Sequence, residues 1–150
     1  MGFMILYYGW SGVFATFGQF VHITFIMALM AAFRASLTLP GIAGLVLTLG
    51  MSVDANVLVY ERIREELRAG RGILAALEMG YDRAAATIWD SNLTTAVAGV
   101  ILYIYGTGPI RGFAVTLLIG IACSIFTAIT VVRLIQEIAI AKFQPKKLSV

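Results

Sequence analysis

Residues 37–71 read LTLPGIAGLVLTLGMSVDANVLVYERIREELRAGR, and this stretch decides the fold. Residues 38–60 hold a single charged residue, Asp54, and a charge-rich segment follows them. A helix rises about 1.5 Å per residue, so roughly 20 apolar residues cross the hydrocarbon core of a bilayer. Backbone polar groups at that depth must be paired within the segment. The stretch is therefore predicted to be a membrane-spanning helix.

Three further stretches have the same character: residues 13–33, 91–110 and 112–132 contain no Asp, Glu, Lys or Arg. The opening residues 1–8 are equally apolar but too short to cross, and they are expected to be the tail of a helix whose start lies outside the chain. Hydrophobic residues make up 60% of the chain and charged residues 13%. This composition excludes an ordinary soluble domain. The sequence predicts an all-α, polytopic transmembrane bundle with four complete spans and a partial one.

The basic residues indicate the orientation. Nine of them would share one side of the membrane if residues 61–90 and the C-terminus lie together: Arg62, Arg64, Arg68, Arg71, Arg83, Arg133, Lys142, Lys146 and Lys147. The other side would hold only Arg34 and Arg111. The positive-inside rule then makes the long loop and the C-terminus cytoplasmic. Within the loop, residues 61–69 and 73–87 are predicted to form short helices along the membrane surface, separated by Gly70 and Gly72.

Small and polar residues recur at every fourth position in three of the predicted spans. They are Gly44, Thr48, Ser52 and Asn56; Ser91, Thr95 and Gly99; and Gly112, Thr116, Gly120, Ser124 and Ala128. Such faces let helix backbones approach closely and place hydroxyls for interhelical hydrogen bonds. We expect a tight bundle.

Asp54 is the one charge inside a predicted span. It lies about 22 Å along the helix from Leu39 and about 9 Å from Tyr60, which places it within the hydrocarbon. A charge at such a depth costs about 2.5–3.5 kcal/mol on insertion scales and is typical of proton relays. The alternative is a structural Asp that is permanently hydrogen-bonded to Asn56, Thr48 or a residue of a neighbouring helix. The residues leave both interpretations open.

Two other titratable residues have open roles. Asp90 opens the third full span, and Asn92 follows it as Asn56 follows Asp54. Asp90 is predicted either to cap the N-terminus of that helix or to share a proton path. His22 lies in an apolar span, where it is either a hydrogen-bonded packing residue or a proton carrier.

Several classes of function lack a sequence signal. A single cysteine, Cys123, excludes an internal disulfide and a cysteine metal site, and it is predicted to be a buried packing residue. The chain shows no phosphate-binding loop, metal-ligand spacing or nucleophile triad, so no enzyme activity and no cofactor other than protons is predicted. The basic residues do not form a stripe along a helix, so nucleic acid is not an expected partner.

Two long stretches resemble a known family. Residues 37–71, with Val53-Asp54-Ala55-Asn56, and residues 80–129, with Asn92-Leu93-Thr94-Thr95 and Gly106-Thr107-Gly108-Pro109, resemble SecD, the membrane subunit of the bacterial SecDF protein-export complex. SecD belongs to the resistance-nodulation-division superfamily. The resemblance implies that Asp54 and Asp90 are the family's acidic positions and that Asn56 and Asn92 support them. It also implies that residues 1–150 are a C-terminal transmembrane domain without the first helix and the periplasmic domain.

The resemblance implies a function as well. SecD-like proteins act with SecF and the SecYEG translocon, and they use the proton-motive force to complete the translocation of unfolded polypeptides across the bacterial cytoplasmic membrane. We therefore expect a multi-pass inner-membrane component in which Asp54 relays protons and the substrate contacts the missing periplasmic domain. The alternatives are a scaffold that docks SecF and the translocon through Gly44 and Gly120, and a fragment of a small-molecule exporter of the same superfamily.

Overall fold

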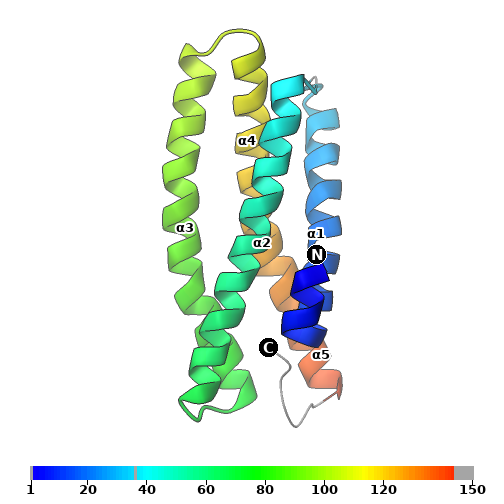
Figure 1. Cartoon of the computed structure of the whole chain (residues 1–150), viewed down its shortest axis with the longest axis vertical. Helices are drawn as coiled ribbons and strands as arrows, with labels where there is room; N and C mark the ends of the chain where they lie inside the picture. Colours follow the sequence, from blue (N-terminus) through cyan, green and yellow to red (C-terminus); the bar gives the residue numbers. More distant parts are fainter. Residues whose placement is uncertain (1, 36, 144–150) are drawn as a thin grey trace.

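The structure, a computed structural model, describes residues 2–35 and 37–143, and these residues form helices joined by short turns (Figure 1). The elements are α1 (Gly2–Ala32), α2 (Leu39–Arg68), α3 (Ile73–Tyr105), α4 (Pro109–Phe126), the π-helical segment η1 (Thr127–Val132) and α5 (Arg133–Phe143). Helices α1 and α3 flank α2 and α4, which lie one in front of the other. The all-α bundle is confirmed for the described residues. Lys146 and Lys147, which entered the charge count, lie outside them.

Three of the described helical stretches are long and apolar enough to cross a membrane: Met4–Ala32, Leu39–Arg68 and Pro109–Ile140. They contain the predicted span 112–132 and all but one end residue, Phe33 or Thr38, of the predicted spans 13–33 and 38–60. The expected span 91–110 is the upper part of α3, which ends at Tyr105. Its apolar stretch starts only after Asp90 and Asn92 and is shorter than the other three. Figure 1 shows this part of α3 beside α4 in the upper half of the bundle.

Helix α1 contains the partial span and the first complete span as two arms that meet at Gly9. Gly9 has φ 54° and ψ −124°, a conformation outside the helical region and strongly disfavoured for residues with a Cβ. The chain reverses so sharply there that a Cβ on Gly12 would collide with the Met4 carbonyl and lie 2.9 Å from the Ile5 Cα. The two glycines therefore allow the opening segment to fold back on the rest of α1.

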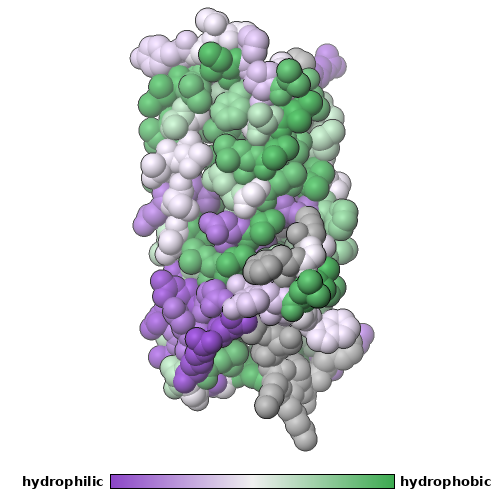
Figure 2. Space-filling view, in the orientation of Figure 1, coloured by the Kyte–Doolittle hydropathy of each residue, from purple (hydrophilic) through white to green (hydrophobic). Residues whose placement is uncertain are grey.

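The prediction of two separate surface helices within residues 61–90 is wrong. Residues 61–68 continue α2 and residues 73–90 begin α3, so the two spans extend as a helical hairpin. Residues 51–69 and 81–98 contain no proline or glycine, so the helical hydrogen bonding continues from the apolar spans into the charged segment at Glu61 and Asp90. The chain turns only at residues 69–72, where Gly70 has a φ of 82°. Figure 2 shows the hydrophilic side chains gathered at the lower end of the visible face, where this hairpin lies.

A buried carboxylate holds the hairpin together. Glu66 is 3% exposed and accepts ion pairs from Arg71 at 2.7 Å and from Arg83 at 2.5 Å. Arg71 lies in the turn and Arg83 lies on α3, so one side chain of α2 ties down both the turn and the neighbouring helix. The two ion pairs offset the free-energy cost of burying the Glu66 charge, whereas removing both partners would leave an unpaired buried charge and destabilise the fold.

Helices α2 and α4 approach each other closely through small residues. A Cβ on Gly120 would lie 2.5 Å from Thr48 Oγ1, and a Cβ on Gly44 would lie 3.1 Å from the Phe113 carbonyl oxygen. Thr48, Ser52 and Asn56 on α2 are buried, as predicted for the small-residue face. Of the predicted positions on α4 and η1, Thr116, Gly120, Ser124 and Ala128 are buried and Gly112 is half-buried. On α3, Gly99 is buried but Ser91 is exposed.

The expected interhelical hydrogen bonds of these hydroxyls are absent from the described residues. Thr48 Oγ1 donates to the Leu45 carbonyl at 3.0 Å, and Thr116 Oγ1 donates to the Gly112 carbonyl at 3.0 Å. Both carbonyls belong to the donor's own helix. A Ser or Thr hydroxyl can reach the carbonyl one turn back on its own helix whatever the distance to the neighbouring helix. This local hydrogen bond therefore forms in place of one across the interface.

Replacing Gly120 by Ala is expected to destabilise the bundle by about 1–3 kcal/mol, because the added methyl would overlap Thr48. The control is Gly50→Ala on the exposed face of α2, where nothing lies within 4 Å of the added Cβ. Thermal unfolding of the purified protein in detergent measures both. Equal melting temperatures for the two variants would show that the α2–α4 contact is not close-packed.

Candidate functional site

Asp54 lies on the outer surface of the bundle. Its side chain is exposed, and its carboxylate has no hydrogen bond or ion pair with any of the residues that the structure describes. The structural alternative for Asp54 is therefore wrong within this chain: Asn56 Nδ2 donates to the Ser52 carbonyl at 3.0 Å, and Thr48 donates to its own helix. Val46 and Leu47, about two turns earlier on α2, are also exposed. Asp54 is thus a single carboxylate at the end of an exposed apolar face.

The prediction that Asp90 caps a helix is wrong. Helix α3 begins at Ile73, with Gly72 before it, so Asp90 lies in the middle of a helix whose N–H groups are already paired. Its side chain is exposed, and its carbonyl accepts from Thr94 Oγ1 at 3.0 Å. The function that remains open for Asp90 is the second one predicted, a share in a proton path.

The register of α2 and α3 places the two acids at the same depth. The helices run antiparallel, and a Cβ on Gly80 would meet Ile63. Asp54 precedes Ile63 by nine residues, and Asp90 follows Gly80 by ten. Both carboxylates are therefore about 14–15 Å along the axis from that contact. They are at one level on neighbouring helices, and both are exposed.

The two asparagines face the other way. Asn56 and Asn92 are 2% and 4% exposed, and each bonds to the carbonyl one turn back, Asn92 Nδ2 to Ile88 at 2.7 Å. Residues i and i+2 lie about 200° apart around a helix, so an Asp on the outside puts the Asn inside. The expected support of the acids by the asparagines is therefore indirect: they fix the helices that carry the acids.

His22 is a buried packing residue that joins three helices. Its ring is fully buried, and Nε2 lies 3.2 Å from the Gly120 carbonyl oxygen of α4. Gln19 Nε2 lies 3.5 Å from His22 Nδ1 and 3.3 Å from the Leu49 carbonyl oxygen of α2. Because Gly120 offers only an acceptor, the ring proton belongs on Nε2, which leaves Nδ1 to accept from Gln19. The hydrogen-bonded alternative for His22 is confirmed.

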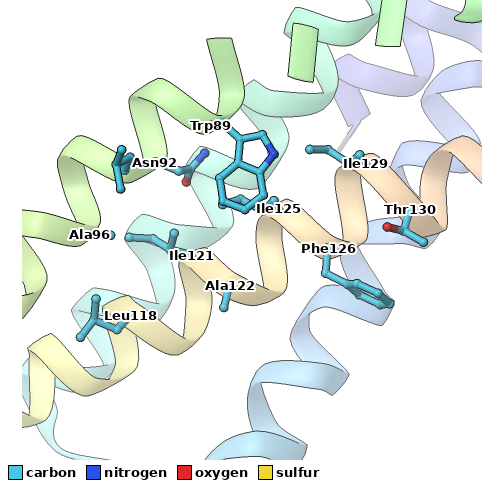
Figure 3. Close-up of a pocket in the computed structure, with 11 residues that line it drawn as sticks. Trp89, Asn92, Ala96, Leu118, Ile121, Ala122, Ile125, Phe126, Ile129 and Thr130 are labelled. Atoms are coloured by element: carbon cyan, nitrogen blue, oxygen red, sulfur yellow. The ribbon is translucent and has the colours of Figure 1, made fainter. Parts of the chain in front are cut away.

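A groove opens between α3 and α4, with a volume of about 510 Å³. Its lining is mainly apolar, with Trp89 and Asn92 on α3 facing Ile121 and Ile125 on α4 (Figure 3). Among the described residues, no group of three or more His, Cys, Asp or Glu side chains could hold a metal ion. Cys123 is buried against Ile26 and Met30, as expected for a packing residue.

Comparison with known proteins identifies the family of the chain. Residues 1–138 match the family model described as protein export membrane protein SecD/SecF, C-terminal. The chain belongs to the SecD/SecF family. The protein translocase subunit SecD of Syntrophobacter fumaroxidans is 54% identical over 148 residues, which cover 99% of this chain and 28% of that protein. The SecD subunit of Anaeromyxobacter dehalogenans is 56% identical over 135 residues, which cover 90% of this chain and 22% of that protein.

A solved structure has the same fold. SecDF from Thermus thermophilus, a translocon-associated membrane protein, superposes with a TM-score of 0.91 at 43% identity and covers 95% of this chain and 20% of its own. The chain is thus a multi-pass membrane protein, and it spans roughly a quarter of the length of the SecD subunits that it matches.

Sequence reasoning missed a tyrosine cluster where the start of α1 packs against the lower half of α2. Tyr8 donates to Glu61 Oε1 at 2.9 Å, and Tyr60 donates to the Ser11 carbonyl at 2.7 Å. The Arg64 guanidinium lies 4.9 Å from the Tyr7 ring centroid and pairs with Glu61 at 2.9 Å. The cluster fastens the reversal of α1 to α2. The Tyr pair at the end of the expected partial span was visible in the sequence, but its partners lie about 50 residues away.

A second missed contact joins α3 to α5. Tyr81 donates to Gln136 Oε1 at 2.9 Å, and both side chains are buried. Burial raises the pKa of Tyr81 well above its ordinary value, so the hydroxyl keeps its proton and remains a donor at physiological pH. The contact positions α5 against the lower half of the bundle.

Replacing His22 by Leu should lower the free energy of unfolding by about 1–3 kcal/mol, because the buried hydrogen bonds of the ring with the Gly120 carbonyl and with the Gln19 amide are lost. The measurement is thermal unfolding together with the level of the protein in membranes. Thr24→Val is the matched control, since its hydroxyl is exposed and bonds only to the Phe20 carbonyl of α1. A His22 variant of unchanged stability that nevertheless lost transport activity would indicate a proton carrier.

Proposed function

We propose that this chain is the membrane part of a protein-export subunit that uses the proton-motive force to assist the translocation of unfolded polypeptides across the cytoplasmic membrane. The observation that carries the proposal is the position of Asp54. Membership of the SecD/SecF family supplies the transport context. The unpaired carboxylate on an exposed apolar face supplies a group whose charge can change at membrane depth.

The face around Asp54 requires a partner. A carboxylate against lipid is costly, so such residues face other helices or a water path. No described residue of this chain covers it, and we infer that the helices of a SecF-like subunit do. A cation or a hydrogen-bond donor on that subunit would stabilise the charged form, and a dry apolar contact would stabilise the neutral form. A proton taken up from the outer side would then change the contact between the two units.

The remaining steps take place outside this chain. The relatives are about four times as long, so we assign the contact with the unfolded polypeptide to a periplasmic domain in the rest of such a subunit. The SecYEG translocon is the proposed source of that polypeptide. The arginines of the α2–α3 hairpin support a cytoplasmic location for the hairpin and the C-terminus, in a bacterial inner membrane.

The scaffold alternative loses the surface that was expected to serve it. Gly44 and Gly120 pack against Phe113 and Thr48 of this same chain, so neither is available to a partner. Docking of SecF or the translocon would have to use another surface, and the exposed face of α2 that carries Asp54 is the one we assign to SecF.

Asp54→Asn should abolish export coupling while leaving membrane insertion intact, because Asn has a similar shape and cannot exchange a proton. A strain depleted of SecD is supplied with a full-length SecD subunit that carries this chain, with or without the substitution. Pulse-labelling then follows the processing of an exported precursor at matched membrane levels. Glu78→Gln, an exposed carboxylate on the cytoplasmic part of α3, is the control and should process at the parental rate. Parental export by Asp54→Asn would end the relay proposal.

Asp90→Asn tests whether the second acid at the same depth contributes. If both carboxylates lie on one path, the variant should slow precursor processing to a rate between those of the parent and Asp54→Asn. The same pulse-labelling assay measures it, with Ser91→Ala as the neighbouring control. An unchanged rate would confine the proposed path to Asp54.

A further inference from the structure

Each of the four long helices places one buried polar side chain at the same depth. The four are Gln19 on α1, Ser52 on α2, Asn92 on α3 and Ser124 on α4, and none is more than 4% exposed. We call these four residues the polar layer. A cluster of this kind in a membrane-spanning bundle must satisfy its own hydrogen bonds, because the surroundings supply none.

The contacts between helices set the common depth. Thr48 of α2 meets Gly120 of α4, and these helices run parallel, so the residues four positions further on, Ser52 and Ser124, are level. Gln19 of α1 bonds to the Leu49 carbonyl, less than one turn from Ser52.

The level of α3 follows from two independent contacts. Gly80 meets Ile63 on antiparallel α2, which places Asn92 opposite Ser52 to within one residue. A Cβ on Gly99 would lie 3.0 Å from Leu118 on antiparallel α4, which places Asn92 opposite Ser124 to within one residue. Both registers agree.

One oxygen of each side chain in the polar layer lacks a partner among the described residues: Gln19 Oε1, Ser52 Oγ, Asn92 Oδ1 and Ser124 Oγ. The amide nitrogens, by contrast, are satisfied, because Gln19 donates to Leu49 and Asn92 donates to Ile88. Orphaned buried oxygens are destabilising, and four at one level point to partners that the side chains and backbone of this bundle do not supply.

We propose that the polar layer is an internal binding site for water. The two amide oxygens can only accept hydrogen bonds, and the two serine hydroxyls can donate one each. A water molecule donates two hydrogen bonds and accepts two, so it matches this set of groups. Buried waters in proteins commonly make about three such bonds to groups that would otherwise be unsatisfied.

A metal cation fits the polar layer less well than water. All four oxygens are neutral, and the nearest carboxylate in sequence, Asp54, lies two residues after Ser52 on the opposite side of α2. An uncompensated charge in a buried site of this kind is far more costly than a neutral water. The inference does not depend on the export function proposed above.

Serine-to-alanine substitutions test the site, because a hydroxyl that binds water and a hydroxyl without a partner are expected to change the melting temperature in different directions. If Ser52 and Ser124 bind water, then Ser52→Ala and Ser124→Ala each remove a hydrogen bond and should lower the apparent melting temperature by about 2–4 °C. If the hydroxyls are truly unpaired, removing them should leave the melting temperature unchanged or raise it, and the proposal is then wrong. Ser91→Ala, an exposed hydroxyl on α3 bonded to its own Ile88 carbonyl, is the control and should not shift it.

A direct measurement completes the test. A cryo-EM or crystal structure of a full-length SecD subunit carrying this chain, at a resolution that shows ordered water, should contain a density peak within hydrogen-bond distance of at least two of the four oxygens. Absence of the peak, with the serine hydroxyls turned to the carbonyls of their own helices, would overturn the proposal. A melting temperature that rises with sodium but not with choline chloride would replace water by a cation and overturn it as well.

Discussion

The rest of the structure depends on the close approach of α2 and α4. Glycines at positions 44 and 120 remove the side chains that would hold the two helices apart, and Thr48 fills the space that Gly120 leaves. With this central pair fixed in parallel register, α1 and α3 pack on either side of it. The same register turns the small-residue face of α2 inward, so Asp54 faces outward.

Much of this arrangement could be predicted from periodicity. The spacing of four between Gly44, Thr48, Ser52 and Asn56 predicted one buried face, and the apolar runs predicted the spans. The partners of the hydroxyls could not be predicted, because spacing defines the face of a helix but not the side-chain rotamer. Thr48 had a carbonyl of its own helix within reach, and local geometry decided the outcome.

In the candidate site, too, some features could be predicted from the sequence and others could not. That Asp54 lies inside an apolar, span-length helix could be predicted by counting residues, and its exposure is the complement of a buried Asn56. The cap predicted for Asp90 failed because a cap requires a helix to start there, whereas Gly70 and Gly72 set the start eighteen residues earlier. The bond between His22 and Gly120 joins residues 98 positions apart, and no local pattern contains it.

Helix α2 is continuous from Leu39 to Arg68, from the apolar span that contains Asp54 to the turn of the hairpin, and this continuity makes it a lever. Asp54 and Glu66 lie about 18 Å apart along this one helix, and Glu66 holds both the turn and α3 through Arg71 and Arg83. A tilt of α2 by about 10° about the level of Asp54 would move Glu66 by about 3 Å. A change at the Asp54 carboxylate that tilts α2 would therefore displace the hairpin at the far end of the helix.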